Sequence, residues 1–162
     1  MDVLLRDDLK FTVTDVRRNV LLPFHVDKAY DRLVVLLHYG PKAISDPAII
    51  MPQIEECVRL YFPAGYQLTE EDMKEYDQLF NFVTLSVDCD GEYVGCAHRH
   101  PPEQKIVISE SGSSWGFAPH AASPGDWRVV LHVQAVVDGT VDCHIAVCGL
   151  ERGETDDLLP SI

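Results

Sequence analysis

The sequence has little positive charge. Its 162 residues include 13 Lys and Arg residues against 26 Asp and Glu residues, which gives a formal net charge of −13. A nucleic-acid-binding protein needs a basic face that neutralises phosphates, and anionic membranes attract basic segments. The acidic balance therefore argues against both partners, and we expect this chain to bind neither nucleic acid nor a membrane.

Long apolar runs and targeting signals are also missing. No stretch approaches the run of about 18 apolar residues that marks a membrane-spanning helix. Residues 1–8 lack the basic stretch and apolar run of a secretory signal. An odd number of cysteines without such a signal indicates reduced thiols, so we predict a cytoplasmic protein. The five cysteines are Cys57, Cys89, Cys96, Cys143 and Cys148.

Catalytic signatures are missing as well. The sequence contains no Gly-x-Ser-x-Gly elbow, no P-loop and no Gly-x-Gly-x-x-Gly. Asp88, Asp90 and Gly91 resemble the start of a calcium loop, but the acidic residue required later in such a loop is missing, so a turn is the better interpretation. We assign no catalytic residue, and the sequence favours a protein that is not an enzyme.

What is present is mainly β patterning. Residues 20–26 and 83–87 alternate between apolar and polar positions, as does the longer segment 127–137. Residues 33–39 are nearly all apolar, as in a strand that is buried on both faces. Seven to nine strands with frequent turns predict a mainly β fold, an antiparallel β-sandwich of the jelly-roll type.

A helical insertion interrupts these strands around residues 46–79. Ser45 or Asp46 can cap a helix that has Pro47 in its first turn. Thr69, followed by three acidic residues, predicts the start of a second short helix that ends near residue 79.

Turn signals and composition set the boundaries of the domain. The dipeptide at residues 138–139, Asp-Gly, predicts a tight hairpin between the strand at residues 127–137 and a strand from Val141 onward. We assign residues 1–150 to a single β-sandwich domain. Residues 151–162 are polar and acidic, and we expect a C-terminal tail or a linker stub there.

One cluster has the residue types of a zinc site. Thiolate and imidazole groups are the ligands that zinc prefers, and a hairpin could bring four of them together. The spacing matches no zinc-finger pattern, however, and the alternative is a solvated histidine pair near free thiols. We therefore predict no cofactor and keep zinc as the one metal to consider. The candidate ligands are Cys89, Cys96, His98 and His100.

A second cluster could bind a ligand or a partner. Aromatic side chains on a sandwich loop can stack on sugars or hold an apolar side chain of another protein. The alternative is that Trp127 begins a core strand while Trp115 and Phe117 close the end of the sandwich. The candidate binding residues are Trp115, Phe117, His120 and Trp127.

Several motifs are shared with a known family. A Gly-Phe-Ala-Pro step at residues 116–119 precedes a Pro-Gly-Asp-Trp turn at residues 124–127, which leads into a long strand. With the apolar segment at residues 22–26, this pattern resembles the N-terminal β-sandwich of PHP-type metal-dependent phosphoesterases. The similarity covers about residues 10–149. Pro-Gly-x-Trp turns also occur in other jelly-roll modules, including secreted pre-peptidase domains.

The resemblance implies an accessory module. In that family a catalytic domain follows the sandwich and opens with a His-x-His metal motif. Here the His-x-His at residues 98–100 lies inside the sandwich, and the chain ends at Ile162, so no catalytic residue can be carried over. We expect a non-catalytic β-sandwich that binds a ligand or protein partner, or that self-associates, through a sandwich edge or a loop end.

Two alternatives remain open. One is a metal-dependent phosphoesterase or other hydrolase that uses His98 and His100. The other is a carbohydrate-binding sandwich that uses Trp115 and Trp127.

Overall fold

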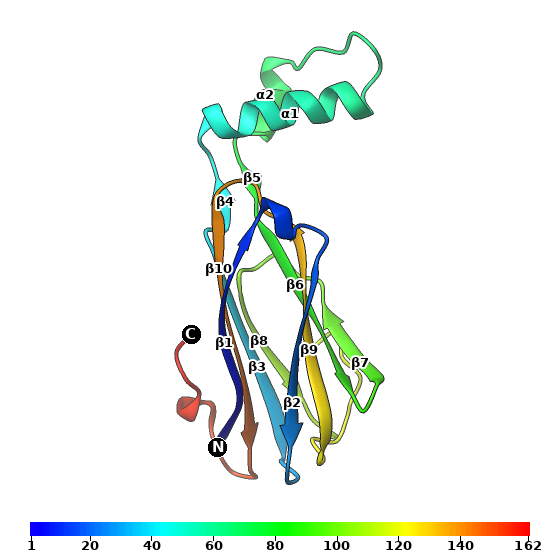
Figure 1. Ribbon diagram of the computed structural model, residues 1–162, viewed down its shortest axis with the longest axis vertical. Helices are drawn as coiled ribbons and strands as arrows, with labels where there is room; N and C mark the ends of the chain where they lie inside the picture. Colours follow the sequence, from blue (N-terminus) through cyan, green and yellow to red (C-terminus); the bar gives the residue numbers. More distant parts are fainter.

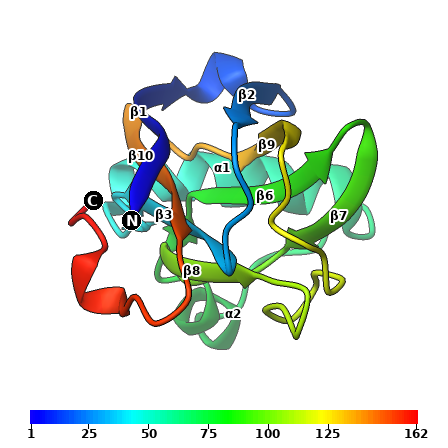
Figure 2. The ribbon, with the colours of Figure 1, turned by 90° about the horizontal axis from the view of Figure 1, so that it is seen from below.

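The chain folds as two antiparallel sheets packed face to face (Figure 1). The computed structural model describes the backbone of residues 1–162 and all side chains except those of Met73 and Lys74. The predicted mainly β sandwich is confirmed, and Figure 2 shows its two layers seen along the strands. Sheet A contains, in spatial order, β1 (Asp2–Thr12), β10 (Thr140–Leu150), β3 (Arg32–Gly40) and β8 (Glu103–Ile108). Sheet B contains β2 (Asn19–Val26), β9 (Gly125–Ala135), β6 (Phe82–Cys89) and β7 (Glu92–Ala97).

The eight strands pair in a nested order. The first strand pairs with the last, β2 with β9, β3 with β8, and β6 with β7. A long antiparallel ribbon that is rolled up in this way is a jelly roll, and it leaves each sheet with four strands. Apart from the β6–β7 hairpin, the strands that pair in this order are therefore far apart in the sequence.

The core lies between the inner faces of the two sheets. On β3 the alternate residues Val35 and Leu37 point into it, and Leu131 and Trp127 on β9 face them from sheet B; all four are at most 1% exposed. Burial of each large apolar side chain contributes about 1.5–3 kcal/mol. The alternation seen in the sequence therefore corresponds to one buried face on each strand.

The hairpin predicted at residues 138–139 is wrong. Gly139 does make a turn, with φ of +61°, but β9 before it belongs to sheet B and β10 after it belongs to sheet A. β10 instead pairs with β1 and β3 over its whole length. The turn carries the chain from one sheet to the other because both flanking strands are already paired with earlier strands.

The helical insertion stands at one end of the sandwich (Figure 1). Its base is a small ribbon of β4 (Ala43–Ile44) and β5 (Leu79–Phe80), from which α1 (Pro47–Tyr61) and α2 (Glu70–Glu75) project. Asp46 caps α1, since its side chain accepts a hydrogen bond of 2.9 Å from the amide of Ala48. The second helix is shorter than predicted, because Leu79 pairs in β5 instead of continuing α2.

The acidic segment at residues 151–162 lies on the outer face of sheet A, where Figure 2 shows it outside β10. A short 3-10 helix, η2 (Asp156–Leu158), interrupts it, as η1 (Val13–Asp15) does after β1. Leu159 and Ile162 pack against buried outward-facing residues of sheet A, and Asp156 pairs with Arg32 at 3.2 Å.

None of the helices in the described part of the chain is long and apolar enough to cross a membrane.

Candidate functional site

Two of the four predicted binding residues lie inside the sandwich. Trp127 is 1% exposed; its ring stacks on Phe24 and its indole N–H donates a hydrogen bond of 3.1 Å to the carbonyl of Ser123. Phe117 is also buried, where its backbone pairs with Gly95. Both side chains are used for packing and are not available to an external ligand.

The other two candidates lie at the surface but do not form a joint site. Trp115 is 92% exposed, and only its backbone carbonyl is held, by the guanidinium of Arg99. His120 is half-buried and packs edge-on against Trp127, with ring centroids 5.0 Å apart. A sugar platform built from Trp115 and Trp127 would need two exposed rings, and only one is exposed.

The two cysteines among the four candidate zinc ligands lie on opposite faces of sheet B, and the two histidines follow the end of β7. Cys89 points into the core, where burial raises the pKa of its thiol to about 11, whereas Cys96 lies on the outer face opposite Ser86. Both histidines contact the Phe82 ring: His98 packs edge-on at 5.2 Å between centroids, and His100 stacks at 4.8 Å. Among the side chains that the structure describes, no three His, Cys, Asp or Glu residues are arranged to hold a metal ion.

The outer face of sheet B carries a hydrogen-bonded chain that sequence reasoning missed. His132 on β9 lies 3.0 Å from the hydroxyl of Ser86 on β6 and 2.8 Å from the side-chain oxygen of Asn19 on β2. Desolvation lowers the pKa of His132, and the nearby His98 adds to this effect. A neutral imidazole that donates from Nδ1 to Asn19 and accepts the Ser86 proton at Nε2 fits all three observations.

This Ser-His-Asn chain lacks the remaining parts of a hydrolase site. Ser86 is only 8% exposed and lies in the middle of β6, which pairs on one side with β7 and on the other with β9. The backbone amides around it are therefore used in the sheet and cannot form an oxyanion hole. We interpret the chain as a polar network that satisfies side chains on the sheet surface.

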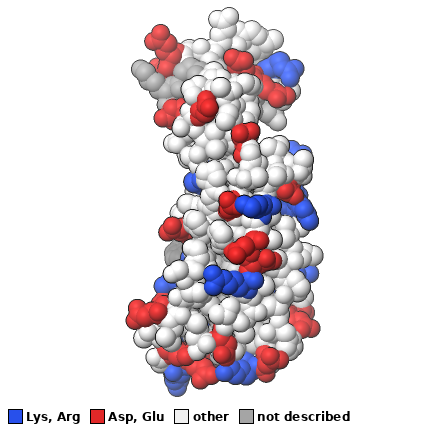
Figure 3. Space-filling model, turned by 60° about the vertical axis from the view of Figure 1, so that its left-hand side comes forward, with Lys and Arg blue, Asp and Glu red and all other residues white. Residues whose placement is uncertain are grey.

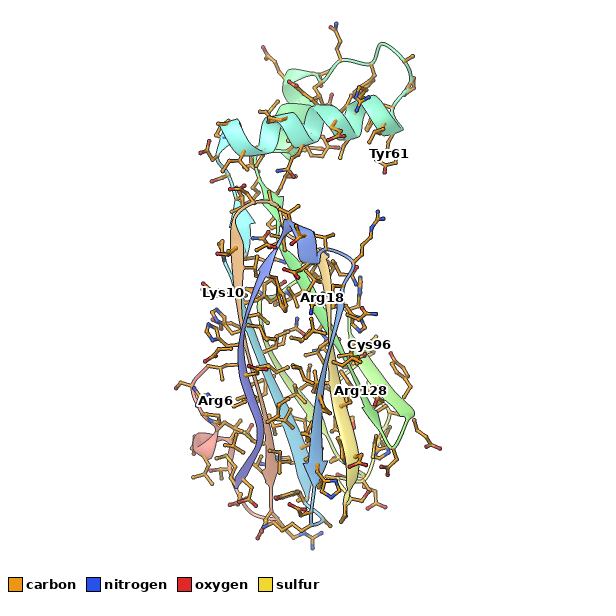
Figure 4. All side chains as sticks on the ribbon, viewed as in Figure 1. Arg6, Lys10, Arg18, Tyr61, Cys96 and Arg128 are labelled. Atoms are coloured by element: carbon orange, nitrogen blue, oxygen red, sulfur yellow. The ribbon has the colours of Figure 1, made fainter. Side chains whose placement is uncertain are left out.

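Exposed large apolar side chains gather on the helical insertion. Of the twelve large apolar side chains that are exposed among the described residues, six lie in this region, and Tyr61, at 80%, is among the most exposed. Figure 4 shows Tyr61 projecting from the end of α1. Such clustering is a mark of an interaction site in a protein that otherwise buries its apolar residues. The six residues are Leu60, Tyr61, Phe62, Tyr66, Tyr76 and Phe80.

Two hollows lie among these side chains. The first, of about 210 Å³, is almost wholly apolar and runs between α1 and the segment after α2. The second, of about 620 Å³, lies between α1 and the loop that follows it, next to Arg59 and Tyr66. The apolar hollow is lined mainly by Ile54, Cys57, Val58, Phe62, Tyr76 and Leu79.

The insertion is strongly acidic. Residues 46–79 include eight Asp and Glu residues against two Lys and Arg residues, so the insertion carries a net negative charge. Both Glu55 and Arg59 line the larger hollow. Figure 3 shows the acidic side chains of the insertion separated by broad uncharged surface, whereas both signs of charge are interspersed over the sandwich. We refer to the exposed apolar side chains and the two hollows on residues 46–80 as the insertion surface.

A compact latch holds the base of the insertion on the sandwich. The fully buried side chain of Asn81 donates to the carbonyl of Pro41 at 2.8 Å and accepts from the amide of Val137 at 2.7 Å. Lys42 donates to the carbonyl of Asn81 at 2.8 Å and to the hydroxyl of Tyr39 at 2.9 Å, and burial lowers the pKa of its amine. These hydrogen bonds therefore attach the insertion firmly to the end of the sandwich.

Comparison with known proteins adds no relative, because no protein-family model, no curated protein and no solved structure matches this chain.

The sequence does contain a signal for the insertion surface. The apolar run at residues 60–62 continues past the single stripe that a surface helix needs to bury, and it precedes a Pro-Ala-Gly stop. Apolar residues beyond the buried stripe of a short insertion indicate a surface that is left for another molecule.

Proposed function

We propose that this chain is a non-catalytic β-sandwich module that binds a protein partner through its insertion surface. The observation that carries the proposal is the gathering of exposed aromatic and apolar side chains around the apolar hollow beside α1. Aromatic side chains beside an apolar pocket are the usual centre of a protein interface.

The charge of the insertion selects the chemistry of the partner. An apolar surface on an insertion of net negative charge attracts Lys and Arg residues and repels acidic surfaces. The partner segment that fits is therefore basic and amphipathic, with large apolar side chains that enter the hollow. The same charge opposes pairing of two insertions with each other, which favours a different protein over a second copy.

The resemblance to the N-terminal sandwich of PHP-type phosphoesterases supports the same proposal. A jelly-roll sandwich without catalytic residues, working beside a separate metal-dependent enzyme, would need a docking surface of its own. We propose the insertion surface for that role.

A peptide-display selection tests the proposal directly. The full chain is immobilised, a random peptide library is selected on it, and the affinity of enriched peptides is measured by fluorescence anisotropy. We expect peptides with several Lys or Arg residues and apolar residues at helical spacing. The double substitution Leu60→Ser, Tyr61→Ser should weaken their binding at least about tenfold, because interface aromatics contribute about 2 kcal/mol or more.

The sandwich offers a matched control for this variant. Leu21 and Tyr93 are exposed to a similar degree, 54% and 68%, but lie on the outer face of sheet B. The double substitution Leu21→Ser, Tyr93→Ser should leave binding unchanged. Enriched peptides without a basic excess, or equal binding to both variants, would refute the proposal, as would self-association by light scattering that the Leu60, Tyr61 variant abolishes.

A further inference from the structure

Four titratable side chains form one row across the outer face of sheet A, far from the insertion surface. Asp8 on β1 lies opposite His144 on β10, His144 lies opposite His38 on β3, and His38 lies opposite Glu103 on β8. The neighbours of His144 along its strand, Cys143 among them, point into the core. All four side chains of the row therefore project on the outer side.

The two imidazoles at the centre of the row are arranged as a pair. Their rings are nearly parallel, at 11°, and their centroids are 5.9 Å apart. Nδ1 of His144 lies 2.6 Å from a carboxylate oxygen of Asp8. A histidine that donates its Nδ1 proton to a carboxylate presents the lone pair of Nε2 outward, and this tautomer is the one that binds metal ions.

The surroundings leave room for a ligand beside the pair. A hollow of about 380 Å³ is lined by His38 and Glu103 together with Pro160 and Ile162 of the C-terminal segment. The side chain of His144 is 37% exposed. Two of the basic residues beside the row are already paired, Lys10 with Asp142 and Lys105 with Asp156, so they do not neutralise its carboxylates. A third, Arg6, lies two residues before Asp8 on β1 and therefore on the same face. Figure 4 shows Arg6 and Lys10, which flank Asp8 in the sequence, projecting on this side of the sheet.

We propose that His38 and His144 form a two-imidazole site for a divalent transition-metal ion. In this site Asp8 orients His144, and Glu103 supplies a carboxylate beside His38. Since no three ligands surround an ion among the described side chains, water completes the coordination. Nitrogen ligands with open positions favour Cu²⁺ over Zn²⁺ and Ni²⁺ according to the general order of divalent affinities. Side-chain rotation must bring both ring nitrogens to about 2.0–2.1 Å from the ion.

A stacked histidine pair can also be simple cross-strand packing, and the test must separate the two. Cu²⁺ is titrated into the full chain in a glycine-containing buffer that competes for loosely bound ions. Binding is followed by calorimetry and by broadening of backbone amide signals in NMR spectra. We expect one tight equivalent, with broadening centred on residues 8, 38, 103 and 144.

Substitutions in the row give the decisive comparison. His38→Asn and His144→Asn should each weaken Cu²⁺ binding at least tenfold, and Asp8→Asn should weaken it about tenfold because an orienting carboxylate has that effect on a bound metal. His120→Asn, which removes a half-buried histidine elsewhere, should leave the affinity unchanged, and well-dispersed NMR spectra report that each variant is folded.

The proposal is refuted if the chain binds no Cu²⁺ at millimolar concentration. It is equally refuted if the double variant of His38 and His144 binds as tightly as the natural chain. Because the insertion surface takes no part, the Leu60, Tyr61 variant should bind Cu²⁺ normally, so this proposal and the partner-binding proposal fail independently.

Discussion

Single residues on the surface of the sandwich show how local contacts set surface chemistry, and His25 on β2 is the clearest case. Its Nδ1 lies 2.6 Å from Asp126, and its Nε2 lies 3.6 Å from Asp27. The hydrogen bond to Asp126 is the main reason that the pKa of His25 is raised above its ordinary value of 6.5, and the charges of Asp126 and Asp27 add to it.

An NMR titration of His25 tests this contact. Its folded-state pKa should lie above 6.5, fall clearly in Asp126→Asn, and fall less in Asp27→Asn. Because the folded pKa is raised, the contribution of this pair to stability is complete below pH 6.5 and is lost as the pH rises through the folded value. Equal shifts in the two variants would contradict the assignment to Asp126.

Gly116 occupies a position that only glycine fits. Its φ is +91°, and a Cβ atom added to it would lie 2.2 Å from the carbonyl oxygen of Cys96. The carbonyl of Gly116 also accepts a hydrogen bond of 2.9 Å from the amide of Cys96. This bond holds the loop that contains Gly116 against β7.

Gly116→Ala should therefore destabilise the sandwich by about 2 kcal/mol or more, since it combines a strained backbone with a clash. Urea denaturation measures the change. Gly112→Ala is the control, because the space around Gly112 is open and its φ is not positive, so its free energy of unfolding should change by less than about 0.5 kcal/mol. Similar effects of the two substitutions would contradict the close approach.

At the scale of elements, the dipeptide Asp-Gly occurs at two turns that connect their strands in different ways. Asp90–Gly91 joins β6 to β7 in a hairpin, with φ of +49° and +83°, as a tight hairpin turn requires. Asp138–Gly139 joins two sheets, and only its glycine has a positive φ. Local sequence therefore predicted that the chain turns at both places but not which strands pair, because pairing depends on strands more than 100 residues away along the chain, such as β1 for β10.

The same difference between local and long-range information applies to the candidate sites. The buried roles of Trp127 and Phe117 were foreseen as an alternative from their place beside core strands. The row of Asp8, His144 and His38 was not, because nothing near any of these residues indicates that their strands are adjacent. A site made of residues from several strands can be recognised only when it is known which residues of neighbouring strands lie opposite one another.

The hydrogen bonds of Asn81 provide a test of how the insertion is attached to the sandwich. Asn81→Ala removes the two hydrogen bonds of a fully buried side chain and leaves the amide of Val137 without its acceptor. Each unsatisfied buried group costs about 1–3 kcal/mol, so urea denaturation should show a loss of at least about 2 kcal/mol.

Amide hydrogen exchange localises that effect, because protection at Val137 should fall more than protection in β3. Asn19→Ala, which alters an exposed asparagine bonded to His132, is the matched control and should cost less than about 1 kcal/mol. Equal losses in the two variants would mean that Asn81 does not hold the insertion in place.

At the scale of the whole molecule, the five thiols report on the integrity of the sandwich. Cys57 is exposed on α1, Cys96 is partly exposed, and the other three are buried. Burial raises the pKa of Cys143 to about 12, which leaves almost no reactive thiolate at neutral pH.

A thiol-labelling time course should therefore give one fast thiol, Cys57, one slower thiol, Cys96, and three that react only when the protein unfolds. Rates for the buried three should rise together with urea, since they belong to one cooperative structure. Cys57→Ser removes the fast phase and identifies it. Fast labelling of Cys143 in the absence of urea would contradict the packing of sheet A.

The nested pairing of the strands also has a consequence for synthesis on the ribosome. β1 is the edge strand of sheet A, and β10 is its neighbour. β1 ends at residue 12, and β10 begins at residue 140. At about 5–20 residues per second, β1 waits roughly 6–25 seconds for the partner that covers its edge. During that time Arg6, Asp7, Asp8 and Lys10 place charged groups along β1, where an uncharged strand would invite aggregation.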